Sequence, residues 1–270
     1  MADKLSKTII LFDMDGTLTK SRQPFNKLLL SDHLYSLTNL GVSIGIITGS
    51  DEDYLHEQMG DFLTNSSCRY KLHLLPCNGT KHFIPPKFAT ESHKLVHSVS
   101  MKEELGVDNY RTLLKELVYS QIDMCNENIP LTGHFINCRG SMINWCPIGR
   151  NADLDEREEF IAIDNKVKLR YGVLEELKTM LKQKKLFDKI VIKYGGDTSF
   201  DIYPKGWDKT YGLKHFQGWD VWFVGDRCEI SGNDHEIYLS CSDKSYKTNG
   251  PEQTRDIINT IIQRLRKDNE

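Results

Sequence analysis

The stretch IILFDMDGTLT, residues 9–19, joins an apolar run to two closely spaced carboxylates. An apolar run rich in β-branched and aromatic residues that ends at a carboxylate predicts a buried parallel strand leading into a loop. Side chains alternate between the two faces of a strand, so Asp13 and Asp15 are expected on the same side where the strand ends. Gly16 permits the sharp turn that follows.

This pair of aspartates predicts a cation. Two neighbouring carboxylates repel each other, and oxygen ligands at the carboxyl end of a sheet suit Mg²⁺. One aspartate can then attack phosphorus while the other transfers the proton. The alternative is a plain Asp-Gly turn after a strand, because a short D-x-D-G match is not specific by itself.

Length and composition narrow the range of functions. The 270 residues suffice for two domains, and the net charge of −3 gives no basic footprint for nucleic acid. No apolar leader and no run of 18 apolar residues occur, so we expect a soluble, cytoplasmic protein without a membrane partner. The seven cysteines contain no C-x-x-C pair and are expected to be reduced thiols.

Further strands are predicted at residues 42–47, 72–75 and 221–226, separated by helical patterns. This alternation predicts an α/β fold with a doubly wound parallel sheet, Rossmann-like in architecture. Thr48 and Ser50 follow the second strand at a helix start, where hydroxyl and N–H groups can bind a phosphate. Ordinary capping of that helix by Ser50 or Asp51 is expected beside this role.

An inserted domain is predicted between two halves of the sheet domain. We expect residues 82–130 to be mostly helical, followed by a hairpin and by further helices and strands, as in an α+β cap. The predicted domains are therefore a core of residues 1–81 and 206–270 and a cap of residues 82–205. His93 and His97 have i, i+4 spacing on the expected helix, where a solvated face is favoured over a Zn²⁺ site.

Polar residues from distant parts of the chain are expected to meet at the sheet. Asp226 ends a buried strand, and the carboxyl ends of parallel strands converge at one crevice. Asn233 and Asp234 offer further oxygen ligands nearby, and Lys209 supplies a cation for the nucleophile and for the phosphoryl group. In the insert, arginines suited to bidentate phosphate binding form a predicted second anion site: Arg139, Arg150 and Arg157. Surface salt bridges with neighbouring acidic residues are the alternative.

Taken together, these motifs resemble one family. The strings FDMDGTLT, RGSMINWCPIGR, GGDTSFDIYP, GWDKTYGL and GDRCEISGNDHEIY are similar to those of eukaryotic-type phosphomannomutases, a branch of the haloacid dehalogenase-like superfamily. The resemblance implies that Asp13 is the nucleophile, that Asp15 is the general acid/base, and that Mg²⁺ is held by Asp13, the Asp15 carbonyl and Asp226. It also implies hexose phosphate binding by Arg22, Arg139, Arg150, Arg157, Ser199 and Asp201. A second, structural cation loop is implied at Tyr238, Ser240 and Asp243.

The implied reaction interconverts mannose 6-phosphate and mannose 1-phosphate, feeding GDP-mannose synthesis. A hexose 1,6-bisphosphate activator would phosphorylate the nucleophile, and cap domains would pair in a homodimer. Thr48 stands where these mutases tend to have Gly, and Cys77 where they have Glu. A Mg²⁺-dependent sugar-phosphate phosphatase, supported by Thr48, and a non-catalytic phosphosugar-binding protein are the alternative functions.

Overall fold

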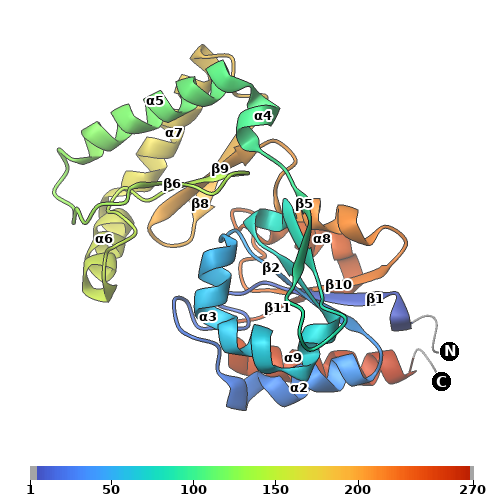
Figure 1. The fold of residues 1–270 in the computed structure, drawn as a ribbon. Helices are drawn as coiled ribbons and strands as arrows, with labels where there is room; N and C mark the ends of the chain where they lie inside the picture. The colour runs from blue at the N-terminus through green and yellow to red at the C-terminus, as the bar shows by residue number, and fades with distance from the viewer. Residues whose placement is uncertain (1–4, 268–270) are drawn as a thin grey trace. The chain divides into compact units, whose positions relative to one another are not determined.

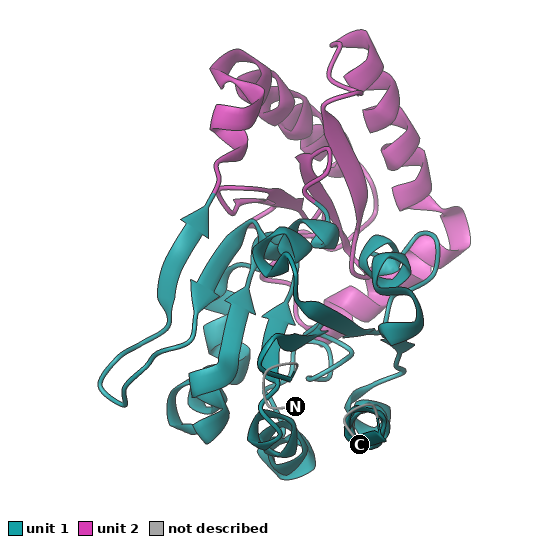
Figure 2. Ribbon diagram, turned by 90° about the vertical axis from the view of Figure 1, so that its right-hand side faces the viewer, with its two compact units in different colours: residues 1–98, 208–270 teal, residues 99–207 magenta. Residues whose placement is uncertain are grey.

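The computed structural model describes residues 5–267, which divide into two compact units (Figure 2). Unit 1 contains residues 5–98 and 208–267, and unit 2 contains residues 99–207. The insertion thus begins about 17 residues later than the predicted boundary at residue 82, and it ends within two residues of the predicted one.

Unit 1 is built on a seven-stranded sheet with the order β11-β10-β1-β2-β3-β4-β5 (Figure 1). The first five strands in this order are parallel, and β4 and β5 are antiparallel additions. The strands are β1 Thr8–Phe12, β2 Ser43–Ile47, β3 Leu72–Leu75, β4 Lys81–Ile84, β5 Lys94–Ser98, β10 Asp220–Gly225 and β11 Ser245–Lys247. The predicted α/β class with a parallel-dominated core sheet is confirmed.

Helices cover both faces of this sheet because alternate strand residues are apolar on both sides. Ile10 and Phe12 pack in one core cluster with residues of α2, α3 and α9, whereas Ile9 and Leu11 pack in another with residues of η3 and α8. The bounds are α2 Lys27–Asn39, α3 Glu52–Asn65, α8 His235–Cys241, α9 Pro251–Lys267 and η3 Lys209–Phe216. Shorter 3-10 turns are η1 Ser67–Lys71, η2 Cys77–Gly79 and η4 Ser242–Lys244.

The helix predicted from residue 82 onward is wrong for its first part. Residues 81–84 and 94–98 form the antiparallel strands β4 and β5, which extend the sheet of unit 1. The outer strand β5 is largely exposed, so it lacks the apolar pattern that identifies a buried strand. His97 therefore lies on a strand and His93 just before it, and His93 Nε2 lies 3.0 Å from the Leu72 carbonyl oxygen.

Four histidines of unit 1 form a row of ring contacts where β3, β4 and β5 lie near η3. His73 Nδ1 lies 2.9 Å from His82 Nε2, and the His215 ring centroid lies 4.4 Å from that of His82 and 4.9 Å from that of His97. Burial is the main reason why the pKa of His73 falls to about 4 and that of His82 to about 3. The His73 and His82 rings are therefore neutral in the folded protein at pH 5 and above.

We expect this cluster to make the fold sensitive to mild acid. In the unfolded chain these histidines titrate near 6.5, so below that pH the unfolded state binds more protons than the folded state. Lowering the pH from 7 to 5 should therefore reduce the free energy of unfolding by about 2 kcal/mol for each histidine that stays neutral. Urea unfolding of wild type and His82→Gln at both pH values measures this, with the exposed His56→Gln as control. Equal pH dependence in the wild type and His82→Gln would contradict the prediction.

Unit 2 is an α+β unit around a four-stranded antiparallel sheet with the order β6-β7-β9-β8. Its strands are β6 Ile136–Cys138, β7 Ile143–Trp145, β8 Ile190–Gly195 and β9 Ser199–Pro204, and its helices are α4 Met101–Leu105, α5 Val107–Met124, α6 Leu154–Val167 and α7 Leu169–Gln183. The predicted hairpin and the later strands are present. Within residues 5–267, no helix combines the length and apolar character needed to cross a bilayer.

Candidate active site

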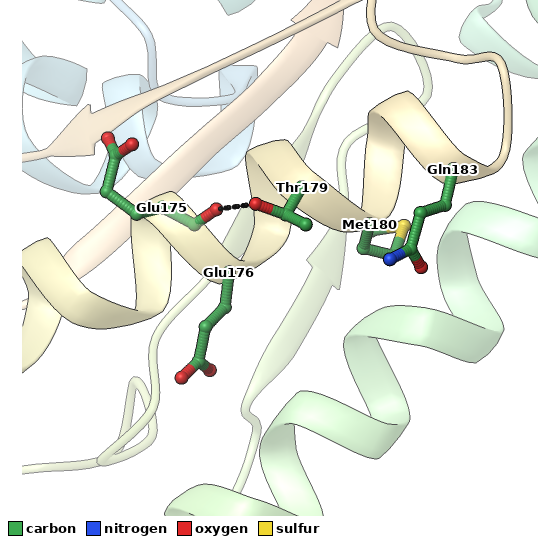
Figure 3. A pocket seen from close by; sticks show the side chains of 5 residues that line it. All are labelled: Glu175, Glu176, Thr179, Met180 and Gln183. Atoms are coloured by element: carbon green, nitrogen blue, oxygen red, sulfur yellow. Dashed lines mark hydrogen bonds between the residues drawn. The ribbon is translucent and has the colours of Figure 1, made fainter.

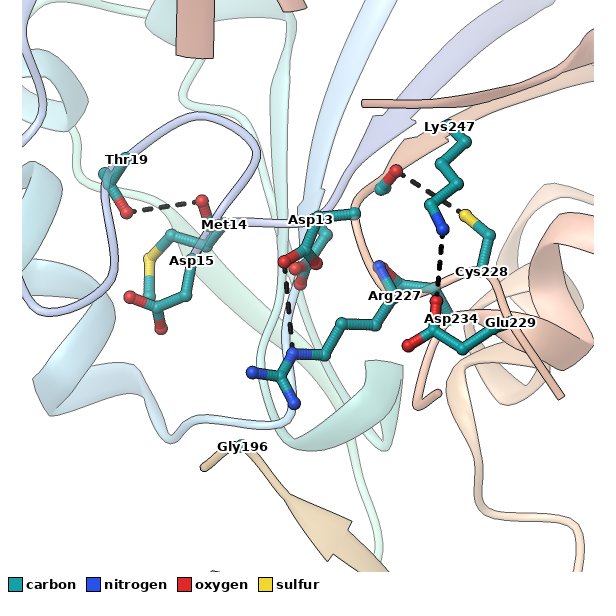
Figure 4. Close-up of polar contacts among 12 residues, drawn as sticks. Asp13, Met14, Asp15, Thr19, Gly196, Arg227, Cys228, Glu229, Asp234 and Lys247 are labelled. Atoms are coloured by element: carbon teal, nitrogen blue, oxygen red, sulfur yellow. Dashed lines mark hydrogen bonds and ion pairs between the residues drawn. The ribbon is translucent and has the colours of Figure 1, made fainter. Parts of the chain in front are cut away.

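The first predicted carboxylates lie at the carboxyl end of β1 (Figure 4). Asp13 directly follows the strand, its side chain is buried, and its N–H donates to the Val224 carbonyl on β10 at 2.9 Å. Gly16 has a φ of +77°, and a Cβ there would lie 2.2 Å from Asp226 Oδ2. Because Gly16 has no side chain, the turn after β1 can come close to Asp226, which follows β10.

Lys209 bridges two buried carboxylates. Its Nζ lies 2.5 Å from Asp13 Oδ1 and 2.5 Å from Asp234 Oδ1, and its side chain is 1% exposed. Lys209 begins η3, where Asp208 caps the helix by accepting from the Thr210 N–H. The structure thus pairs the predicted cation with the predicted nucleophile. It also shows Asp234, predicted only as a further oxygen ligand, as a second partner of Lys209.

Three carboxylates converge around this lysine and could hold a metal ion. Oxygen atoms of Asp13, Asp226 and Asp234 all lie within 4.8 Å of one another. Among the described residues, Asp226 Oδ1 and Asn233 Oδ1 are buried without a hydrogen-bond partner. A buried acceptor without a donor is costly, and a hard cation would satisfy it. This oxygen-rich donor set therefore fits Mg²⁺.

Burial and mutual repulsion tune the charges of the cluster. Burial and the carboxylates of Asp234 and Asp226 raise the pKa of Asp13, while the Lys209 ammonium opposes the rise. Burial and the charge of Asp234 likewise raise the pKa of Asp226 to about 6. For Lys209, burial disfavours the charged form, but the two carboxylates outweigh it and the net pKa is raised. Lys209 therefore stays protonated and is the cation that keeps an ionised Asp13 tolerable.

The loop after β2 forms the predicted polar turn before α3. Thr48 is buried, its hydroxyl accepts from the Ser50 N–H at 3.1 Å, and its own N–H donates to Leu75. Asp51 is the N-cap of α3 and accepts from the Tyr54 N–H at 3.1 Å, so the capping expected of Ser50 or Asp51 belongs to Asp51. The phosphate-binding roles of Thr48 and Ser50 stay predictions.

Asp15 is held by two donors. The Arg22 backbone N–H and the Tyr54 hydroxyl each donate to Asp15 Oδ1 at 3.1 Å. Burial raises the pKa of Asp15, and these two hydrogen bonds counteract the rise. The predicted acid/base residue thus lies in the same turn as Asp13. Sequence reasoning did not single out Tyr54 as a functional residue.

A second polar cluster lies within unit 2, on the sheet. The Asn144 amide donates to Ser199 Oγ at 3.0 Å and to Asp201 Oδ1 at 2.8 Å, and its carbonyl accepts from Arg150 Nη1 at 3.0 Å. The structure therefore brings together three of the predicted substrate residues. Asn144, which links them, was not predicted, although a polar residue inside the apolar run 142–145 is the signal that could have found it.

Two more predicted arginines are buried in unit 2. Arg157 Nε donates to the Ala152 carbonyl at 3.0 Å, and its Nη1 donates to Thr198 Oγ1 at 2.7 Å. Its Nη2 donates to the Arg150 carbonyl at 3.2 Å, so this guanidinium supports the loop that carries Arg150. Arg139 is 6% exposed, just after β6. Their roles as anion ligands stay predictions.

The residues predicted for a second cation loop have other contacts in the structure. Ser240 donates to the Glu236 carbonyl one turn back in α8, and Asp243 is exposed and pairs with Arg264 at 2.5 Å. Tyr238 lies in the same helix, and its N–H donates to the Asp234 carbonyl. The binding of a cation by these three residues therefore stays a prediction.

A shallow pocket on α7 does not suit the predicted phosphate ligand. It is lined by Glu175, Glu176, Thr179, Met180 and Gln183 (Figure 3). This lining carries two acidic side chains and no basic one, so it would repel an anion. The candidate functional residues therefore form two separate groups, the carboxylate and lysine cluster within unit 1 and the polar cluster within unit 2.

Two solved structures show how far this fold is shared. An IMP-bound Plasmodium falciparum IMP-nucleotidase mutant aligns with a TM-score of 0.64 and 14% identity over 96% of this chain and 68% of that chain. The C-terminal domain of C. albicans trehalose-6-phosphate phosphatase aligns with a TM-score of 0.58 and 15% identity over 97% of this chain and 94% of that chain. At these identities the likeness establishes the fold alone.

Sequence relatives identify the family. A family model described as eukaryotic phosphomannomutase matches residues 30–264. A phosphomannomutase of Solanum lycopersicum is 33% identical over 271 residues, which cover 100% of this chain and 99% of that protein. One of Arabidopsis thaliana is 35% identical over 256 residues, which cover 94% and 96%. The resemblance read from the motifs is confirmed, and the chain belongs to the eukaryotic phosphomannomutase family.

Proposed function

We propose that the protein moves a phosphoryl group between C1 and C6 of mannose phosphate, as a Mg²⁺-dependent phosphomannomutase. The observation that carries the proposal is the buried Asp13–Lys209 pair, with Asp15 two residues further on, in a chain of this family. The mannose 1-phosphate formed would feed GDP-mannose synthesis. The cytoplasmic location and the homodimer through unit 2 remain predictions from the sequence.

Asp13 would be the phosphoryl acceptor. Lys209 binds its Oδ1, so the carboxylate is fixed and its negative charge is compensated. An Asp13 oxygen attacks the phosphorus of a hexose 1,6-bisphosphate, and the bond from phosphorus to the sugar oxygen breaks. An aspartyl phosphate and a hexose monophosphate result. The same ammonium also offsets charge on the transferring phosphoryl group.

Asp15 would carry the proton. It protonates the departing sugar oxygen, and it later takes a proton from the hydroxyl that attacks the aspartyl phosphate. Burial raises the pKa of Asp15, which favours a protonated carboxyl before the first transfer. Returning the phosphoryl group to the other end of the sugar completes the interconversion.

Mg²⁺ would be held by Asp13 and Asp226 with the Asp15 carbonyl. Asp234 lies beside the two carboxylates, and Asn233, which precedes it in the chain, would be a further oxygen ligand. When bound, the ion supplies positive charge to the phosphoryl oxygens. The remaining side chains act without it: Lys209 fixes the nucleophile, and Thr48 and Ser50 offer hydroxyl and N–H groups for the phosphate.

Unit 2 would recognise the part of the substrate that is not reacting. Its Asn144-centred cluster presents Arg150, Ser199 and Asp201, which suit a phosphate and sugar hydroxyls. Arg22 and Arg139 are proposed to add positive charge for the same ligand. Binding the second phosphate away from Asp13 would position the sugar for transfer.

³¹P NMR with Mg²⁺, mannose 1-phosphate and a trace of hexose 1,6-bisphosphate tests the proposal. We expect the C1 phosphate signal to be replaced by a C6 phosphate signal, at a rate that depends on the bisphosphate. Accumulation of inorganic phosphate without the C6 signal would instead identify a sugar-phosphate phosphatase. That result would direct attention to Thr48, whose hydroxyl resembles that of phosphatase relatives.

A further inference from the structure

We infer that Tyr54 is a positioning residue for Asp15, and that its hydroxyl fixes the carboxylate in the orientation needed for proton transfer to the sugar oxygen. The inference rests on the proposed function in one respect, namely the role of Asp15 as acid/base. Tyr54 itself is not assigned any contact with substrate.

Both donors to Asp15 bind the same oxygen. The Tyr54 hydroxyl and the Arg22 N–H each lie 3.1 Å from Oδ1. Within residues 5–267, no group donates a hydrogen bond to Oδ2. A carboxyl whose Oδ1 accepts two hydrogen bonds carries its proton on Oδ2. The contacts therefore distinguish the two oxygens and assign proton transfer to Oδ2.

Tyr54 is itself firmly placed. It lies in the first turn of α3, where its N–H donates to the capping carboxylate of Asp51 at 3.1 Å. Its ring is half-buried and packs against the apolar cluster between the sheet and α2, α3 and α9. Tyr54 thus contacts both the polar turn after β2 and the turn after β1. Its hydroxyl binds Asp15 while its backbone is fixed in α3.

Loss of the hydroxyl would loosen one carboxylate and leave the nucleophile in place. The terminal torsion of an aspartate has a broad energy minimum, so with one donor instead of two the carboxyl group can rotate. Proton transfer is sensitive to such displacements, whereas Asp13 is fixed separately by Lys209. The loss of rate should therefore appear only with phosphoryl donors whose leaving group must be protonated.

Rapid-quench measurement of phosphoenzyme formation tests this with Tyr54→Phe. With hexose 1,6-bisphosphate, we expect the rate to fall roughly 10- to 100-fold with KM unchanged, which is below the full contribution of a general acid. With acetyl phosphate, whose acetate leaves without a proton, the rate should stay within about threefold of wild type. Tyr35→Phe, at an exposed tyrosine of α2, is the matched control and should behave as wild type.

The same change in an Asp15→Asn background gives a second test. There Tyr54→Phe should cause no further loss, because the group that it positions is gone. An equal loss with both phosphoryl donors, no loss at all, or an added loss in the Asp15→Asn background would each overturn the inference. Wild-type protein that forms no phosphoenzyme from the bisphosphate would instead overturn the proposed function, and this inference with it.

Discussion

Replacing Asp13 with Asn is expected to lower kcat for the mannose phosphate interconversion by roughly 10,000-fold or more, the scale seen when a catalytic nucleophile is removed. The amide keeps the size of the side chain but cannot form an acyl phosphate. Asp234 still pairs with Lys209 in this variant, so the fold should be retained. Coupled assays of kcat and KM measure the effect.

Asp53→Asn is the matched control for this prediction. Asp53 is an exposed carboxylate in the first turn of α3, and its replacement should leave kcat within about twofold, as for most surface changes. Residual turnover of Asp13→Asn above a tenth of the wild-type rate, in protein with an unchanged circular dichroism spectrum, would mean that another residue accepts the phosphoryl group.

Lys209→Met is expected to have the largest effect on stability. The change leaves Asp13 and Asp234 buried and facing each other without a cation, and removing one partner of a buried ion pair costs about 3–5 kcal/mol. The difference from wild type should narrow as the pH falls, because a protonated carboxyl no longer repels its neighbour. Urea unfolding at two pH values measures both effects.

Lys214→Met removes an exposed lysine from the same 3-10 helix and serves as the control. It should change the free energy of unfolding by less than about 1 kcal/mol, since its charge is solvated and its contact is with the Tyr211 ring. Equal stability of the Lys209→Met variant and the wild type at neutral pH would contradict the ion-pair arrangement described for the site.

The sequence was sufficient for the parts of the site that follow from strand order. Asp13 and Asp226 end buried parallel strands, and such strands end at the same edge of a sheet, so their proximity could be predicted. Lys209 needed a further step, because a lysine at a helix start is usually solvated. The family motif, more than any local pattern, indicated that it points inward.

Other contacts depend on tertiary structure that no local pattern encodes. Asp234 reaches Lys209 because the loop after β10 folds back, with the Arg227 N–H donating to Asp234 at 3.2 Å. A Cβ at Gly225 would lie 2.4 Å from the same carboxylate, so this approach also requires a glycine. From the sequence, Asp234 was predicted as a further oxygen ligand of the metal, and its ion pair with Lys209 was not predicted.

The strands β4 and β5 were not predicted for a similar reason. Residues 94–98 are largely exposed at the edge of the sheet, so neither alternation nor an apolar run marks them as a strand. Their pairing instead follows from Phe83, which lies opposite Leu74 of β3 and Leu95 of β5. Such cross-strand partners cannot be identified from one sequence.

Trapping the phosphoenzyme tests the central claim most directly. Protein mixed with Mg²⁺ and hexose 1,6-bisphosphate, quenched in acid and digested, is examined by mass spectrometry for a phosphorylated peptide. A second portion is mixed with mannose 6-phosphate before the quench. We predict a phosphoryl group on Asp13 that mannose 6-phosphate removes faster than water does, with mannose 1,6-bisphosphate as the product. A phosphoryl group on another residue, or one that only water removes, would contradict the account.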